Sequence, residues 1–185
     1  MKRIVIFDGN AIIHRAYHAI PPLTTKDGKM VNAVYGFTSM LLKVWKDLQP
    51  SCIAVTFDMS GPTFRHVQYK EYKATRVKAD QALYDQIPLV HEVVEAFDLP
   101  IYEKKGYEAD DVIGTIVKKL EKEKDTEVFI VTGDMDTLQL VSDKAKVYTL
   151  RKGISDVVVY DVAAVKARFG FGPEKMIDYK ALRGD

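Results

Sequence analysis

The chain has 185 residues, of which 47% are hydrophobic and 29% are charged, as expected for one globular domain. Its 27 basic and 26 acidic residues nearly cancel to a formal net charge of +1, so only the local distribution of charge can indicate a partner. The single cysteine excludes an intrachain disulfide, and no apolar run is long enough for a membrane span or a signal peptide, so we expect a cytoplasmic protein.

Three short runs rich in Val, Ile and Phe predict strands that are buried on both faces of a sheet. They cover residues 3–7, 52–57 and 127–132. The second run contains Cys52, which we expect to be a buried thiol. Segments with helical periodicity alternate with these strands at residues 34–48, 83–97, 109–122 and, more briefly, 136–141. This alternation favours a mainly parallel sheet with helices on both sides.

Further elements extend the α/β pattern. They are an edge strand at residues 100–102, a hairpin or edge pair at 146–150 and 156–160, and helices at 162–169 and 173–182. Asp161 is a suitable N-cap for the first of these helices, and Pro173 is suited to the first turn of the second. The sequence shows no repeat and no long linker, so we expect residues 1–185 to form a single domain.

A basic stretch interrupts the pattern after the second strand. Between Gly61 and Lys78, Glu71 is the single acidic residue. The basic residues are Arg65, Lys70, Lys73, Arg76 and Lys78, and the interleaved aromatic residues are Phe64, Tyr69 and Tyr72. We expect this insertion of about residues 61–80, called the basic segment below, to project from the core. Lysine and arginine meet phosphates and tyrosine offers a stacking surface for unpaired bases, although a solvated loop is the alternative.

Acidic residues follow each predicted core strand. They are Asp8 after the first strand, Asp58 after the second, Asp134 and Asp136 after the third, and Glu108, Asp110 and Asp111 at the start of the helix at 109–122. The loops at the carboxyl ends of parallel strands converge on one edge of the sheet, where ligands bind. A helix cap or a turn explains each residue alone better than a functional site does, so the hypothesis of a site depends on their conjunction.

Carboxylates gathered at one edge repel one another unless a cation offsets their charge. Oxygen ligands without histidine or cysteine favour Mg²⁺ or Mn²⁺ over zinc. Two such ions about 4 Å apart can activate water and stabilise the attacking and leaving oxygens in phosphodiester hydrolysis. The sequence therefore predicts a site for two Mg²⁺ ions, in which Mn²⁺ can substitute.

Taken together, these motifs resemble the 5'-3' exonuclease domain at the amino end of bacterial DNA polymerase I, within the flap endonuclease family. The matching segments are Phe7-Asp8-Gly9-Asn10, Phe57-Asp58, Phe64-Arg65 through Tyr72-Lys73-Ala74-Thr75-Arg76, Gly106-Tyr107-Glu108-Ala109-Asp110-Asp111, Thr132-Gly133-Asp134-Met135-Asp136 and Leu182-Arg183-Gly184-Asp185. The combination of the acidic blocks with the Tyr-Lys-x-x-Arg segment is specific, whereas no single piece would be.

The resemblance implies a PIN-like α/β fold with a basic helical arch, and a nuclease that cuts DNA at 5' flaps or from 5' ends in primer removal and repair. By the family pattern the metal ligands, or their close support, would be Asp8, Asp58, Glu108, Asp110, Asp111, Asp134, Asp136 and Asp185. Lys73 and Arg76 would face the scissile phosphate, and Tyr72 would stack on the terminal nucleotide. Arg65 and Lys70 would contact phosphate more generally.

The resemblance departs at the last residues. In the family the final Gly-Asp is followed by a further aspartate and by a helix-hairpin-helix element that grips the duplex, and neither follows Asp185 here. We therefore expect a catalytic domain without that element. Its expected partners are DNA with a 5' flap or 5' end and a polymerase module or a separate carboxy-terminal piece, with the chain itself a monomer.

Other classes fit these motifs less well. Asn10 stands where a phosphatase of the haloacid dehalogenase type needs a second aspartate, and Asp8 stands where a Toprim enzyme needs glutamate. A PIN-type ribonuclease has a similar acidic site but lacks an arch-like basic segment. The non-enzyme alternative is a DNA-binding remnant that is inactive without the missing carboxy-terminal element.

Overall fold

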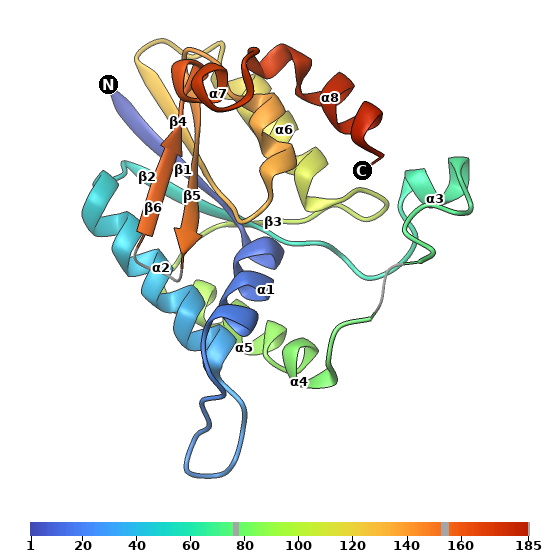
Figure 1. The fold of residues 1–185 in the computed structure, drawn as a ribbon. Helices are drawn as coiled ribbons and strands as arrows, with labels where there is room; N and C mark the ends of the chain where they lie inside the picture. Colours follow the sequence, from blue (N-terminus) through green and yellow to red (C-terminus); the bar gives the residue numbers. More distant parts are fainter. Residues whose placement is uncertain (76–77, 153–155, 185) are drawn as a thin grey trace.

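The strands of the molecule lie side by side in one twisted sheet (Figure 1). The computed structural model describes residues 1–75, 78–152 and 156–184. The strands are β1 (Lys2–Asp8), β2 (Cys52–Thr56), β3 (Ile101–Tyr102), β4 (Thr126–Val131), β5 (Ala145–Lys152) and β6 (Asp156–Tyr160). Within the described residues they form a six-stranded sheet in the order β3-β2-β1-β4-β5-β6. Neighbours pair in parallel except β5 and β6, which are antiparallel, so the predicted mainly parallel sheet, edge strand and terminal strand pair are confirmed.

Helices cover both faces of the sheet (Figure 1). One face carries α1 (Gly9–Ala19), α2 (Asn32–Leu48), α4 (Gln81–Tyr84) and α5 (Ile87–Ala96). The other carries α6 (Ala109–Leu120), α7 (Val162–Phe169), α8 (Met176–Arg183) and the 3-10 turns η1 (Met135–Leu140) and η2 (Pro173–Lys175). In the described part of the chain, no helix has the length and apolar character needed to cross a membrane.

The central strand β1 contributes to both hydrophobic cores. Val5 and Phe7 pack with the helices of one face, and Ile6 between them packs with those of the other. All three side chains are fully buried, because successive residues of a strand point to opposite faces. Burying an aliphatic or aromatic side chain contributes about 1.5–3 kcal/mol, so the two cores fix the positions of the strand ends firmly.

Helix α1 was not predicted from the sequence. Asp8, the last residue of β1, is its N-cap, and its Oδ1 accepts a hydrogen bond of 3.0 Å from the backbone N–H of Ala11. A side chain at Gly9 would collide with the ring of Phe57, so glycine lets α1 approach the end of β2. Asp-Gly-Asn is a typical turn sequence, which explains why a helix start was read as a turn only.

The predicted helix at 83–97 is divided into α4 and α5. Gln86 lies between them and is fully buried. Its Oε1 accepts a 2.8 Å hydrogen bond from the N–H of Ala33, and its Nε2 donates to Asn32 Oδ1 at 3.1 Å. Pro88 follows in the first turn of α5, where proline is tolerated. The break therefore fastens the start of α2 to α5.

One smaller expectation was wrong, and two helices take a different form from the one expected. Cys52 is exposed rather than buried, because it is the outermost residue of β2 and burial begins with Ile53. The short helix expected at 136–141 is the 3-10 turn η1. The helix expected at 173–182 consists of η2 followed by α8.

The part of the basic segment that contains α3 (Phe64–Gln68) lies away from the sheet (Figure 1). Among its described residues, helical structure is confined to α3 (Phe64–Gln68). Turns continue to residue 75, and Arg76 lies outside the described residues. The predicted arch is therefore helical at its beginning only, within the part of the chain that the structure describes.

Candidate active site

An open cavity lies where the strand order of the sheet reverses. β1 pairs with β2 on one side and with β4 on the other, so the loops after β1 and β4 lead to opposite faces. In open α/β sheets, ligands bind outside the carboxyl ends of the strands at this switch point. The cavity has a volume of about 420 Å³, and Asp8 from the end of β1 and Asp134 from the segment after β4 both line it.

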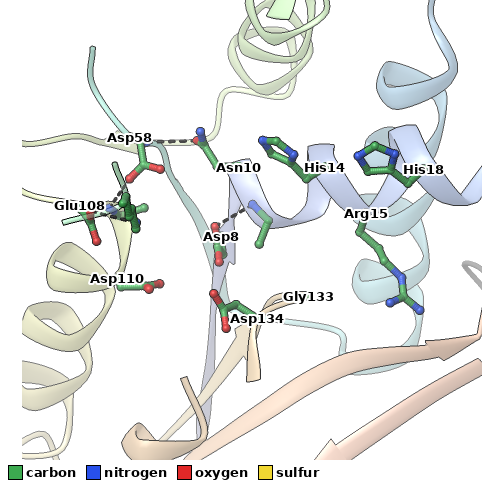
Figure 2. Close-up of a pocket in the computed structure, with 13 residues that line it drawn as sticks. Asp8, Asn10, His14, Arg15, His18, Asp58, Glu108, Asp110, Gly133 and Asp134 are labelled. Atoms are coloured by element: carbon green, nitrogen blue, oxygen red, sulfur yellow. Dashed lines mark hydrogen bonds and ion pairs between the residues drawn. The ribbon is translucent and has the colours of Figure 1, made fainter. Parts of the chain in front are cut away.

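Acidic side chains from four parts of the chain line this cavity. Those among the described residues are Asp8, Asp58, Glu108, Asp110 and Asp134. Figure 2 shows them on one side of the cavity, directed toward a common space. The structure thus brings together five of the seven carboxylates that the sequence placed at strand ends and at the helix start.

Asp8 is held by two hydrogen bonds inside the protein. It is only 4% exposed, and its Oδ2 accepts a 2.7 Å hydrogen bond from the hydroxyl of Thr132 while Oδ1 caps α1. Burial raises the pKa of Asp8 to about 6, although both hydrogen bonds act in the opposite direction. The carboxylate that ends β1 therefore has a fixed orientation and an unfavourable charge.

The pKa of Asp110 is raised further than that of Asp8. Burial and repulsion, first from Asp8 and then from Asp134, raise the pKa of Asp110 to about 7. A positive ion close by would offset this repulsion. As placed, no three His, Cys, Asp or Glu side chains of the described residues form a group that could hold a metal ion. The described carboxylates face a common space without forming a compact cluster of three.

Asp58 connects two of the elements that form the cavity. Its Oδ1 accepts a 2.7 Å hydrogen bond from the N–H of Ala109 at the start of α6. Its own N–H donates to Asn10 Oδ1 at 3.1 Å, as Figure 2 shows. The loop after β2 is thereby fixed to both α1 and α6.

Asp111 and Asp136 face away from the shared cavity. Asp111 forms an ion pair with Arg65 at 2.7 Å, and the hydrogen bonds from this guanidinium lower the pKa of Asp111. Asp136 pairs with Lys180 of α8 at 2.7 Å. Each lines a separate, smaller cavity. Asp185, the remaining predicted ligand, lies outside the described residues.

The basic segment reaches the cavity through two side chains. The Tyr72 hydroxyl donates to Glu108 Oε2 at 3.1 Å, and Lys73 Nζ donates to Glu108 Oε1 at 3.0 Å. Lys73 also lines the cavity, and its φ of 55° is in the left-handed region that residues other than glycine seldom adopt. Lys70 is exposed on the same segment.

Sequence reasoning missed the contribution of α1. His14, Arg15 and His18 line the cavity beyond the carboxylates (Figure 2). Asn10, His14 and His18 are spaced four residues apart, which places them on one face of a helix. This spacing is visible in the sequence, but it has meaning only once the segment after Asp8 is known to be helical.

Comparison with known proteins shows the family to which this chain belongs. Residues 3–170 match the family model described as the 5'-3' exonuclease, N-terminal resolvase-like domain. The chain is 44% identical over 184 residues to DNA polymerase I of Bacillus subtilis (strain 168), covering 100% of this chain and 21% of that protein. It is 43% identical over 185 residues to DNA polymerase I of Caldicellulosiruptor bescii, covering 99% and 22%. The chain thus spans about a fifth of the length of these curated relatives.

Solved structures share the fold at low sequence identity. The T5 D15 protein co-crystallised with metal ions superposes with a TM-score of 0.78 and 19% identity, over 100% of this chain and 67% of that one. The catalytic core of Rad2 in complex with DNA substrate superposes with a TM-score of 0.54 and 17% identity, over 100% and 55%. These likenesses establish the arrangement of sheet and helices.

Proposed function

Because the chain belongs to the family of 5'-3' exonuclease N-terminal resolvase-like domains, we propose that it hydrolyses phosphodiester bonds of DNA at 5' ends and 5' flaps, using divalent cations. The observation that carries the proposal is the meeting of separate carboxylates in one cavity whose edge is formed by a lysine of the basic segment. The names of the relatives and of the solved structures point the same way, since they include a polymerase, a metal-bound protein and a DNA complex.

The chemistry of the donor set in the cavity suits a hard divalent cation, and the carboxylates would have to draw together to share one. Asp8, Asp58, Glu108, Asp110 and Asp134 would hold the cations, and these side chains offer carboxylate oxygens, which suit Mg²⁺ or Mn²⁺. The raised pKa of Asp110, at about 7, reflects a repulsion that a cation would relieve. When bound, two such ions supply the Lewis acidity that phosphodiester hydrolysis requires.

The protein's own side chains orient the cavity and the DNA. Thr132 and the start of α1 fix Asp8, while Ala109 fixes Asp58. Lys73 would exchange Glu108 for a DNA phosphate, and Tyr72, freed from the same carboxylate, would stack on a terminal base. Lys70 would contribute a more general phosphate contact. Arg76 and Asp185 keep their proposed roles as a phosphate contact and a metal ligand, although both lie outside the described residues.

The proposal also covers the partner of the domain, its oligomeric state and the process in which it acts. The relatives are polymerases of which this chain matches about a fifth, so a polymerase module is the proposed partner, with primer removal and repair as the setting. The chain would act as a monomer in the cytoplasm. Asp136 would join the metal site only after release from Lys180.

A cleavage assay with matched carboxylate variants tests the proposed function. The purified chain is mixed with an end-labelled 5' flap, made either of DNA or of RNA, in Mg²⁺ or Mn²⁺. We expect cleavage of the DNA flap, and we expect Asp134→Asn to abolish it while binding to the flap survives. Asp143→Asn is the control, because Asp143 is exposed and precedes β5, at the opposite edge of the sheet.

Two other outcomes would overturn the proposal in different ways. Cleavage of the RNA flap alone would identify a ribonuclease of similar architecture. Binding of the DNA flap without cleavage in either metal would identify a DNA-binding domain whose carboxylates have another role.

A further inference from the structure

Arg65 and Asp111 form a two-pronged ion pair between the basic segment and α6. Arg65 Nη1 donates to Asp111 Oδ2 and Nη2 donates to Oδ1, both at 2.7 Å. The pair is partly buried, with 31% of the arginine side chain and 21% of the aspartate side chain exposed. Paired parallel hydrogen bonds of this kind are strong and geometrically specific. Nη1 also lies 3.7 Å from Glu108 Oε2, so the guanidinium faces two carboxylates at the start of α6 and pairs more closely with Asp111.

The carboxylate in this pair also shapes the start of α6. Asp111 Oδ2 accepts a 3.0 Å hydrogen bond from the backbone N–H of Glu108, which closes the first turn of the helix. Glu108 and Asp110, which line the cavity, lie in this turn. A change at Asp111 would thus reach the cavity through the backbone.

Independent contacts join α3 to the same place. The N–H of Phe64 donates to the carbonyl of Gly106 at 2.9 Å, and the rings of Phe64 and Tyr107 lie 5.5 Å apart. The guanidinium of Arg65 lies over the Phe64 ring at 4.6 Å. This joint immediately precedes the turns that bring Tyr72 and Lys73 back to Glu108.

We propose that Arg65 and Asp111 are a positioning pair, which fastens the basic segment to α6 so that Tyr72 and Lys73 lie over Glu108. This assignment rests on the proposed function of the cavity. It replaces the roles expected from the sequence, in which Arg65 contacts phosphate and Asp111 binds metal.

A double-mutant cycle separates these roles. Arg65→Ala, Asp111→Ala and the double variant are compared by hydrogen exchange of the peptide at residues 69–75, in metal-free and DNA-free protein. A positioning pair predicts faster exchange of this peptide in each single variant and no further increase in the double variant. Unchanged exchange in either single variant would overturn the proposal, whether or not the protein is a nuclease.

The same variants are then assayed with the 5' flap. We expect kcat to fall about 100-fold in each single variant, the size of effect that misplacement of a catalytic group produces, and to fall no further in the double variant. Effects that multiply would mean that the two residues act independently, as a phosphate contact and a metal ligand would, and would refute the pair.

Two further variants serve as controls in this cycle. Lys70→Ala should raise KM, and its effect should multiply with that of Asp111→Ala, because Lys70 is on the same segment but outside the pair. Arg65→Lys keeps the charge but loses the forked geometry, so faster exchange of residues 69–75 is again expected. Exchange at the wild-type rate in Arg65→Lys would show that charge alone fastens the segment and would reject the forked pair as its cause. Far-UV circular dichroism of every variant verifies that the sheet is intact.

Discussion

The hydroxyl of Thr132 donates a 2.7 Å hydrogen bond to Asp8 across 124 positions of the sequence. The same hydroxyl oxygen accepts a 2.9 Å hydrogen bond from the N–H of Asp134. Thr132 is fully buried, so one side chain sets the position of a carboxylate on β1 and of the segment after β4. Two carboxylates of the candidate site therefore share one support.

Thr132→Val removes this support while nearly keeping the shape of the side chain. We expect it to lower the free energy of unfolding by about 1–3 kcal/mol, because Asp8 and the Asp134 N–H each lose a buried partner. Urea denaturation measures this change. Thr132→Ser keeps the hydroxyl, so it should retain Mg²⁺ affinity where Thr132→Val loses it; equal affinity in both variants would count against the hydrogen bond.

The stability of the metal-free protein should depend on the ionisation of Asp110. Its carboxyl has a pKa of about 7 in the folded protein against an ordinary value of 3.8, so the folded form binds the proton more tightly than the unfolded chain does. The stability from this group is present at low pH and is lost as the pH rises from 3.8 to about 7. Asp110→Asn should therefore stabilise the protein more at pH 8 than at pH 5.

Urea denaturation in EDTA at these two pH values measures the difference for Asp110→Asn. Its size cannot exceed about 1.4 kcal/mol for each pH unit in the window. Asp143→Asn, which alters an exposed carboxylate, is the control and should show no such dependence. The same stabilisation by Asp110→Asn at pH 5 and pH 8 would show that repulsion in the cavity is not its cause.

Mg²⁺ should raise the melting temperature of the wild-type protein, and more so at pH 8 than at pH 5. In the proposed site the ion would bind the native state and displace the protons that Asp8 and Asp110, with pKa values of about 6 and 7, hold at low pH. Thermal denaturation with and without millimolar Mg²⁺ measures the shift. An equal shift at both pH values would place the bound ion away from these carboxylates.

In the proposed site, Lys73 would compete with a cation for Glu108. The ammonium group of Lys73 lies 3.0 Å from Glu108 Oε1, and 39% of the Lys73 side chain is exposed. We therefore expect Lys73→Ala to raise Mg²⁺ affinity by about twofold to fivefold, as loss of a surface ion pair would. DNA cleavage should fall in the same variant, since the proposed phosphate contact of Lys73 would be lost. Calorimetric titration measures the affinity, with Lys70→Ala as a control that should leave it unchanged.

Gly9→Ala tests the close approach of α1 to β2. The added methyl group would enter the space of the Phe57 ring, so we expect a loss of about 1–3 kcal/mol in unfolding free energy. Gly114→Ala is the control, because a methyl group there would meet only ordinary contacts with Leu140. Equal stability of the two variants would show that the ring of Phe57 moves aside without cost.

The strand ends could be predicted because they depend on local signals. Short β-branched runs followed by an acidic residue mark buried strands and their carboxyl ends, and parallel strands bring such ends together. The helix after Asp8 was missed because its N-cap aspartate and glycine also form a typical turn. Gly9 lies against the ring of Phe57, which is distant in the sequence, and this tertiary contact favours the helix start over a turn.

The division of the carboxylates could not be predicted from spacing. Asp110 and Asp111 are adjacent, yet one faces the cavity and the other pairs with Arg65, which is 46 positions away. Likewise Asp134 lines the cavity while Asp136 pairs with Lys180. These differences depend on which basic residue the tertiary fold brings near, and sequence periodicity does not encode that.

The bond between Asp8 and Thr132 also links the site to the order of events in folding. β1 and β4 pair in parallel, and the chain between them includes β2, β3 and the helices that accompany them. Closing so long a loop is slow, because its entropy is lost before the contacts form. Asp8 and Asp134 could therefore share a ligand only once β1 and β4 have paired. During refolding, the time at which metal affinity appears would therefore report when β1 and β4 pair.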